Sequence, residues 1–202
     1  MVLENKTLKG IQTRNHIMEI ALNLFESQGY DKVSVDKIVK ESNTSKGSFY
    51  QHFPSKSSIF MFRFMEIDDN YVRIYEKLKL KYSLAIERLE AFCFAVLQCI
   101  ENELGKDLIR VIYSEAIINS EHTFFNDGNR ILHRIIYQII EEGREDSSIK
   151  KIDSTKDLFK LIVQSLFGAI YYWGLQTNDK KLEALGKPLI TQVIISLSVK
   201  EY

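Results

Sequence analysis

Residues 34–56 read Ser34-Val-Asp-Lys-Ile-Val-Lys-Glu-Ser-Asn-Thr-Ser-Lys-Gly-Ser-Phe-Tyr-Gln-His-Phe-Pro-Ser-Lys56, and this pattern predicts two short helices joined by a tight turn. Ser34 and Ser45 are favourable N-cap residues, because a serine hydroxyl accepts a hydrogen bond from a backbone N–H of the first helical turn. Asn43 tolerates the left-handed backbone that a tight turn needs. Pro54 ends the second helix, since the residue before a proline is kept out of helical geometry. The stretch is therefore a predicted helix-turn-helix.

The second of these helices has two unlike sides. Phe49 and Phe53 lie four residues apart, which places both on one buried face. The other side carries hydrogen-bond donors, one small residue and no acidic group: Lys46, Gly47, Ser48, Tyr50, Gln51 and His52. A helix of this kind fits the major groove of DNA, whose walls are phosphates. The pattern thus indicates a helix that reads DNA.

The residues from Ser45 to Lys56 strongly resemble the recognition helix of TetR-family transcriptional repressors. The match extends back through Ala21-Leu-Asn-Leu-Phe-Glu-Ser-Gln-Gly-Tyr30 and Val35-Asp-Lys-Ile-Val39, and it covers about residues 11–60. Asn43 and Thr44 stand where the family usually has Gly and an aliphatic residue, and Gln51 stands where an aromatic residue is common. None of these departures removes a donor. The resemblance implies a homodimeric repressor that binds a palindromic operator and is released by a small, mostly hydrophobic effector.

Nine residues are predicted to contact double-stranded operator DNA: Ser34, Thr44, Ser45, Lys46, Gly47, Ser48, Tyr50, His52 and Lys56. Lys46 can donate to guanine O6 or N7, Gly47 permits close backbone approach, and Ser48 can contact a base or a phosphate. Tyr50, His52 and Lys56 are expected to anchor phosphates, which positions a protein without reading sequence. The two capping serines and Thr44 are further phosphate candidates. Helix capping is the alternative role of the serines.

The composition favours an all-helical, cytoplasmic regulator. The 202 residues contain two prolines and nine glycines, and the formal net charge is zero, so the whole molecule is not a generic polyanion binder. No stretch of about 18 uninterrupted apolar residues exists, and no leader is evident, so we expect no membrane segment. Cys93 and Cys99 stand six apart on one predicted helix and face different sides, so we expect free thiols.

The predicted fold is all-α, with about nine helices in two domains. Residues 1–54 form a three-helix DNA-binding domain, with residues 1–10 as a polar lead that is either disordered or carries Lys6 and Lys9 to phosphate. Residues 55–202 form a helical effector-binding and dimerisation domain. Its helices are expected near 55–80, 83–103, 106–119, 122–143, 155–177 and 182–199, with breaks at Gly, Asn, Asp and Ser clusters.

The last two predicted helices are the expected dimer interface. Residues 158–175 are apolar on almost every side, so this helix needs burial partners on two sides. One partner is its own domain, and the other is a second copy of the chain, which the family resemblance also implies. A purely intramolecular core is the alternative.

Eight residues of the second domain are candidates for effector binding: Phe92, Arg110, Tyr113, His133, Tyr137, Gln164, Phe167 and Tyr171. They are aromatic groups, or polar groups inside apolar runs, and such groups can orient a mostly hydrophobic small molecule. Plain core packing is the alternative for each aromatic residue. No cofactor is predicted. His122 and His133 lack a paired ligand spacing, so no metal site is predicted either.

Two other function classes are alternatives to the regulator. An all-helical enzyme would need a nucleophile with its base, a phosphate-binding glycine loop or a metal spacing, and the sequence shows none of these. An architectural DNA-binding protein without an effector would lack an internal cavity and show weak sequence preference.

Overall fold

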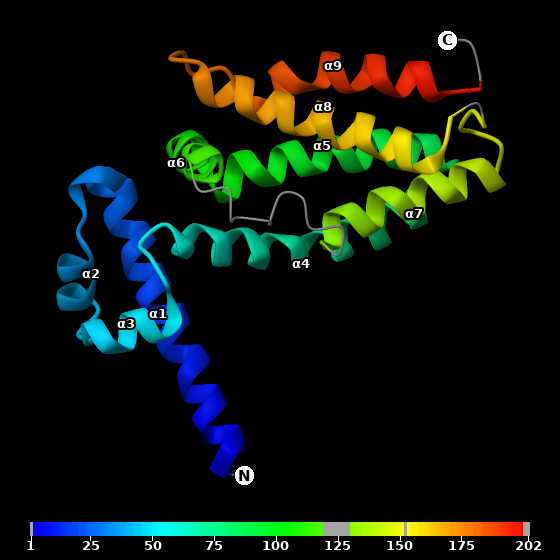
Figure 1. Ribbon diagram of the computed structural model, residues 1–202. Helices are drawn as coiled ribbons and strands as arrows, with labels where there is room; N and C mark the ends of the chain where they lie inside the picture. The colour runs from blue at the N-terminus through cyan, green and yellow to red at the C-terminus, as the bar shows by residue number, and fades with distance from the viewer. Residues whose placement is uncertain (1, 119–129, 152, 200–202) are drawn as a thin grey trace. The chain divides into compact units, whose positions relative to one another are not determined.

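The computed structural model describes residues 2–118, 130–151 and 153–199, and within these ranges it has nine α-helices, one short 3-10 helix and no strand (Figure 1). The predicted all-α fold is confirmed. The chain divides into two compact units, Met1–Phe64 and Met65–Tyr202, which we call the head and the body. The division falls inside the fourth helix, whereas the sequence predicted a domain boundary at residues 54–55.

The head contains α1 (Val2–Gln28), η1 (Tyr30–Lys32), α2 (Val35–Glu41), α3 (Lys46–His52) and the start of α4. The predicted turn at Asn43 and the predicted helix end before Pro54 are confirmed. Gly29 closes α1 with a φ of 83°, Asn43 has a φ of 50° in the turn between α2 and α3, and Phe53 before Pro54 is extended. Ile38 from α2 and Phe49 from α3 are fully buried, together with Phe53. The two short helices are therefore held in place by their apolar sides.

Two helix starts differ from the predictions. α1 begins at Val2, so most of the expected polar lead is helical, because this segment is rich in helix-forming Leu, Glu and Lys and its one glycine is tolerated. The side chain of Lys6 lies outside the described part of the structure, and Lys9 is exposed. α4 begins at Ser58, three residues after the predicted start at residue 55. Ser55 caps this helix, since its Oγ accepts from Ser58 N at 3.1 Å and its N–H donates to Ser58 Oγ at 3.2 Å.

The body comprises the remainder of α4 (Ser58–Lys81), α5 (Ala85–Glu103), α6 (Gly105–Ile118), α7 (Ile131–Glu145), α8 (Thr155–Leu175) and α9 (Leu182–Leu197). Four of the predicted helices agree with α5, α6, α8 and α9 to within two residues at each end. The helix predicted at 122–143 is described from Ile131, and residues 119–129, including His122, lie outside the described residues.

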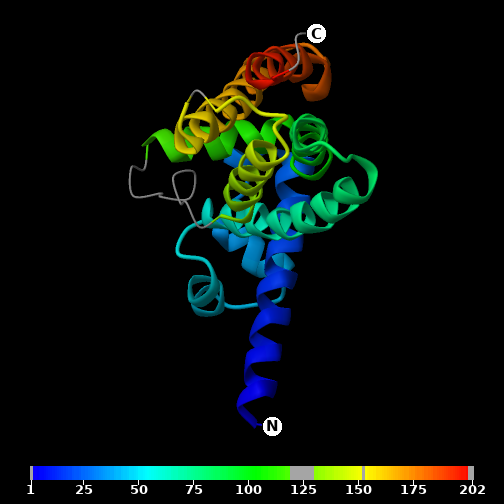
Figure 2. The ribbon, with the colours of Figure 1, turned by 90° about the vertical axis from the view of Figure 1, so that its right-hand side faces the viewer.

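The helices of the body pack in adjacent pairs. α5 lies against α7 and α9, and α8 lies against α6, α7 and α9. Figures 1 and 2 show α8 and α9 running side by side. By length and composition alone, α8 could cross a membrane, but here it is one of the packed helices of the body. Its Leu166, Ile170 and Trp173 are buried in that core.

A buried ion pair joins α4 to the start of α7. Arg130 donates from Nη2 and Nε to the two carboxylate oxygens of Asp68, at 2.9 and 3.2 Å, and both side chains are at least nine-tenths buried. The two-pronged geometry compensates much of the desolvation cost of burying both charges. This pair is a structural contact that the sequence did not predict.

Candidate functional site

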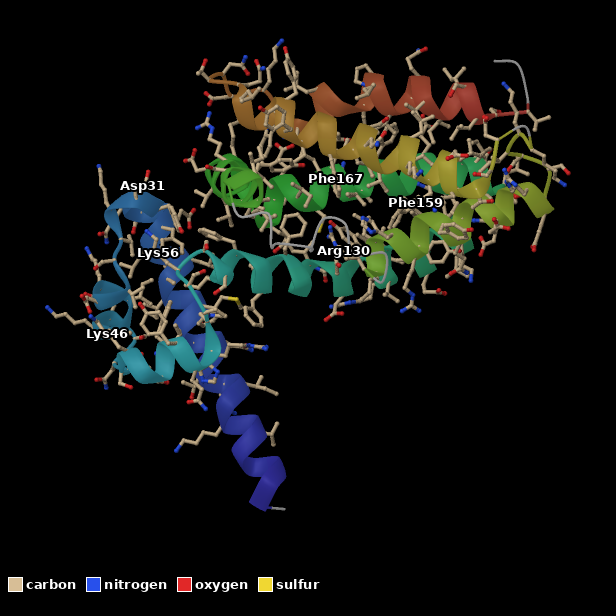
Figure 3. All side chains as sticks on the ribbon, in the orientation of Figure 1. Asp31, Lys46, Lys56, Arg130, Phe159 and Phe167 are labelled. Carbon is tan, nitrogen blue, oxygen red and sulfur yellow. The ribbon has the colours of Figure 1, made fainter. Side chains whose placement is uncertain are left out.

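The exposed side of α3 gathers most of the predicted DNA-contacting residues. Lys46, Gly47 and Tyr50 are exposed, and Ser48 and His52 are half-buried. Phe49 between them is fully buried and stacks edge-on against Tyr50, with ring centroids 5.3 Å apart. The helix is thus anchored by one side, and the other side projects its donors outward. Figure 3 shows Lys46 at the start of α3.

Gly47 has open space around it within the protein. The nearest atom to a Cβ built at this position is Ser45 Oγ at 3.8 Å, and the backbone of Gly47 is helical. The fold therefore gives no steric reason for glycine at this position. A close approach of the α3 backbone to a base or phosphate would give one.

The hydroxyl groups of the turn are partly used inside the head. Ser34 Oγ accepts from Lys37 N at 3.2 Å, and Ser45 Oγ accepts from Ser48 N at 3.1 Å, so both serines have the capping role that the sequence left as an alternative. Capping uses an acceptor lone pair, so each hydroxyl hydrogen can still be donated to a phosphate. Thr44 Oγ1 lies 2.8 Å from Ser42 Oγ.

Lys56 is tied to the backbone of the head. Its Nζ donates to the carbonyl oxygens of Tyr30 and Val33, both at 2.9 Å, and lies 3.8 Å from the centroid of the Tyr30 ring. These contacts fasten the segment before α4 to the end of η1. The structure therefore gives Lys56 a structural role, whereas the sequence predicted a phosphate anchor.

The candidate effector residues fall into two groups in the body. The first lies between α7 and α8, where the ring of His133 packs against Phe159 and Phe167 at centroid distances of 5.3 and 6.3 Å. Tyr137 joins this group through Phe159, at 6.2 Å. Phe159 was not among the predicted site residues, and its position four residues after Thr155 gives no signal that it faces His133. Figure 3 shows Phe159 and Phe167 on α8.

The second group lines a surface groove between α6 and α8 with a volume of about 380 Å³. Its lining includes Arg110, Tyr113 and Tyr171 of the predicted set, together with Ile109, Ser114, Ile117, Gly174 and Leu175. The rings of Tyr113 and Tyr171 are 5.8 Å apart, and the Tyr113 hydroxyl donates to the carbonyl of Phe167 at 3.1 Å. This groove is open and mostly apolar, with few polar groups at its rim.

Arg110 is bound to the end of α8. Its Nε donates to Gly174 O at 2.7 Å, its Nη2 to Gln176 O at 2.9 Å, and its Nη1 to the Asp107 carboxylate at 2.9 Å. A cation at the C-terminus of a helix is stabilised by the helix dipole. Arg110 therefore closes α8 and shapes the groove, and these bonds use three of its five N–H donors.

Phe92 and Gln164 join neither group. Phe92 is fully buried against Tyr71 and Tyr75, with ring centroids 6.0 and 6.3 Å apart, which is the core packing given as the alternative. Gln164 is exposed on α8.

The described residues offer little for a reactive-cysteine site or a metal site. Cys93 and Cys99 are not joined in a disulfide; burial raises the pKa of the Cys93 thiol to about 12, and Cys99 is half-buried. A thiol with so high a pKa is a poor nucleophile and metal ligand. Within the described ranges, no three His, Cys, Asp or Glu side chains are grouped so as to hold a metal ion.

An exposed apolar face runs along α8 and α9. Leu161, Tyr172 and Leu175 of α8 and Leu189 of α9 are each more than two-fifths exposed. Gly168 lies between the first two on the same helix, and a Cβ built there meets nothing within 4 Å. The exposed side of α8 between Leu161 and Leu175 is therefore largely apolar.

Comparison with known proteins agrees with this architecture. Residues 17–61 match the family model described as bacterial regulatory proteins, tetR family. An HTH-type transcriptional regulator of Staphylococcus aureus (strain USA300) is 30% identical over 186 residues, which cover 86% of this chain and 88% of that protein.

Solved structures share the fold at low identity. A TetR-family transcriptional regulator from Pectobacterium atrosepticum superposes with a TM-score of 0.73 at 18% identity, over 96% of this chain and 97% of that one. Thermus thermophilus FadR, a TetR-family repressor in complex with lauroyl-CoA, has a TM-score of 0.70 at 18% identity, over 94% and 97% of the two chains. The chain belongs to the TetR family of bacterial transcriptional regulators, which bind DNA and are not enzymes.

Proposed function

We propose that this chain is a cytoplasmic, ligand-responsive repressor that binds a palindromic operator as a homodimer. The observation that carries the proposal is the exposed side of α3, where Lys46, Gly47 and Tyr50 face outward. Gly47 has open space around it, and Tyr50 is 53% exposed although its ring stacks on Phe49. Groups that face outward in this way are available for recognition. Base contacts then come from the start of α3, and phosphate contacts from Tyr50, His52 and the hydroxyls of Ser34, Thr44 and Ser45.

Dimerisation is proposed through α8 and α9, close to the predicted ranges 155–177 and 182–199. One seven-residue recognition helix reads only a few base pairs, and a two-fold dimer doubles the site. The exposed Leu161, Tyr172 and Leu189 offer the apolar surface for such an interface. Gly168 lets a second helix approach closely.

The effector is proposed to bind in the body at the aromatic groups around Tyr113 and His133. Support comes from the apolar groove between α6 and α8, and from the related fold of FadR, whose structure contains lauroyl-CoA, a molecule with a long apolar chain. The ligand would act by binding more tightly to a conformation whose two heads no longer match the half-sites, so that DNA is released.

The test is selection of a binding site from random duplex DNA by the purified full-length chain. We expect a palindromic sequence, bound by two protomers, with an affinity that falls as salt rises and survives unrelated competitor DNA. Lys46→Ala and Tyr50→Ala should each weaken binding at least tenfold, with Lys32→Ala, an exposed lysine of η1, as the matched control.

Recovery of no preferred sequence would contradict sequence-specific repression. Weak binding to all duplexes alike would instead favour an architectural DNA-binding protein.

A further inference from the structure

An acidic side chain lies beside the first residue of the recognition helix. The Asp36 carboxylate of α2 is 2.6 Å from Lys46 Nζ of α3, and the two side chains are 68% and 60% exposed. The contact raises the pKa of Lys46 through a hydrogen bond and a Coulomb attraction from Asp36, so Lys46 is charged at any working pH. The carboxylate is thus on the same exposed edge as the donors of α3.

Asp36 supplies a charge that α3 itself lacks. No acidic residue stands in the first turn of α3, and Lys46 places a cation at the helix end where the dipole is already positive. A neighbouring anion offsets this arrangement. Because the pair is exposed, it contributes little to stability, and its removal should leave the fold intact.

The same pair affects binding to DNA. Phosphate attracts free lysines without regard to sequence, and this attraction supplies most non-specific affinity. A carboxylate paired with Lys46 cancels that attraction locally. It still leaves two of the three ammonium hydrogens for a guanine edge, which rewards the correct base.

We propose that Asp36 is a specificity-determining residue that positions Lys46 toward the base edges and keeps it from non-specific phosphate contacts. The assignment rests on the proposed role of α3 as the DNA reader. It predicts that removing the carboxylate increases affinity for any DNA more than affinity for the operator.

The experiment compares the wild-type chain with Asp36→Asn, Lys46→Ala and the double variant. Affinity is measured for the sequence that the wild-type chain selects and for a scrambled duplex, at two salt concentrations. Asp31→Asn is the control, because Asp31 is also exposed and acidic but lies well away from Lys46 in the head (Figure 3). Thermal unfolding of each variant checks that the fold is retained.

We expect Asp36→Asn to bind the scrambled duplex about tenfold more tightly, with a steeper salt dependence from one added phosphate contact per protomer. The selected sequence should gain less than threefold, so the specificity ratio falls. In the Lys46→Ala background the effect of Asp36→Asn should shrink to that of Asp31→Asn.

Equal effects of Asp36→Asn and Asp31→Asn, an unchanged specificity ratio, or an effect that persists without Lys46 would each overturn the assignment. These outcomes leave the proposed function standing. A wild-type chain that selects no sequence overturns the proposed function, and this assignment with it.

Discussion

Polar side chains on α3 of the head are exposed, whereas many of those in the body are bonded to the backbone of another helix or buried. On α3, Lys46 and Tyr50 are exposed, and the core below them is made by Phe49. In the body, Arg110 and Tyr113 donate to backbone carbonyls of α8, and Arg130 is buried with Asp68. On α3 the outward-facing donors are distinct from the buried Phe49, although Ser34 and Ser45 both cap helices and are proposed phosphate contacts. The body uses many of its polar groups for packing. Substitutions should therefore separate stability from binding in the head more cleanly than in the body.

The largest effect on stability should come from Asp68→Asn. The substitution leaves Arg130 buried without its carboxylate, and breaking a buried pair by removing one partner typically costs 3–5 kcal/mol, so we expect a loss of about 3 kcal/mol in the free energy of unfolding. Urea denaturation of the full chain measures it. Asp69→Asn is the control, because Asp69 is exposed on the same helix and should cost less than about 0.5 kcal/mol. Equal stability of the two variants would show that the pair does not hold α4 to α7.

Lys56→Met tests a predicted DNA contact whose side chain is bound to the backbone of the head. The variant keeps the length of the side chain but loses two hydrogen bonds from a charged donor to Tyr30 O and Val33 O. We expect the head to lose about 2 kcal/mol, measured as faster hydrogen exchange of its amides. Lys40→Met, at an exposed position of α2, is the control.

A different outcome would support the predicted phosphate contact of Lys56. If exchange is unchanged and the salt dependence of DNA binding falls by the equivalent of one phosphate contact, Lys56 acts as a phosphate anchor.

Glu142→Gln should have the smallest effect, and one that depends on pH. Partial burial opposes ionisation of Glu142, but hydrogen bonds from Tyr75, Gln138 and Arg88 outweigh it and lower its pKa below the ordinary 4.5. A carboxyl group with a depressed folded-state pKa contributes stability above its unfolded pKa, and this is lost as pH falls through the folded value.

The expected loss for Glu142→Gln is about 1 kcal/mol at pH 7. The difference from the wild-type chain should shrink below pH 4.5, as the wild-type carboxyl becomes protonated. Glu145→Gln, exposed on the same helix, is the control and should cost less than about 0.5 kcal/mol at pH 7. A difference that stays constant down to pH 3 would contradict the lowered pKa.

Much of the head could be predicted from the sequence because its signals are local. Ser34, Asn43 and Pro54 each act through the backbone within a few residues, so caps, turn and helix end follow from their identities. The two carbonyls that hold Lys56 could not be predicted, since they lie 26 and 23 residues earlier in the chain. The start of α1 was wrong because a polar segment and a solvated helix have similar compositions.

The helices of the body could be predicted from the sequence, but the partners of its candidate effector residues could not. Hydrophobic periodicity gave α5, α6, α8 and α9 within two residues at each end. Periodicity shows which face of a helix is apolar, but it does not show which partner that face meets. Arg110 was therefore predicted as a ligand group because it interrupts an apolar run, and only the fold reveals that Gly174 O and Gln176 O are its partners. For Phe92, likewise, the sequence could not distinguish a ligand contact from the core packing that the structure shows.

The most direct test of the separation between folding and recognition compares two glycines of the same chain. A Cβ at Gly143 in the body would lie 2.4 Å from Ile149 Cδ1, whereas a Cβ at Gly47 would meet nothing closer than 3.8 Å. Gly143→Ala should therefore lower the free energy of unfolding by about 2 kcal/mol through overpacking.

The measurement to make on Gly47→Ala is its affinity for the selected DNA sequence, together with its free energy of unfolding on the same preparation. We predict unchanged or slightly raised stability, since alanine favours a helix by about 1 kcal/mol over glycine, and at least a tenfold loss of affinity. Unchanged affinity, or a loss of affinity that accompanies a loss of stability, would contradict the claim that the exposed side of α3 serves DNA recognition and not the fold.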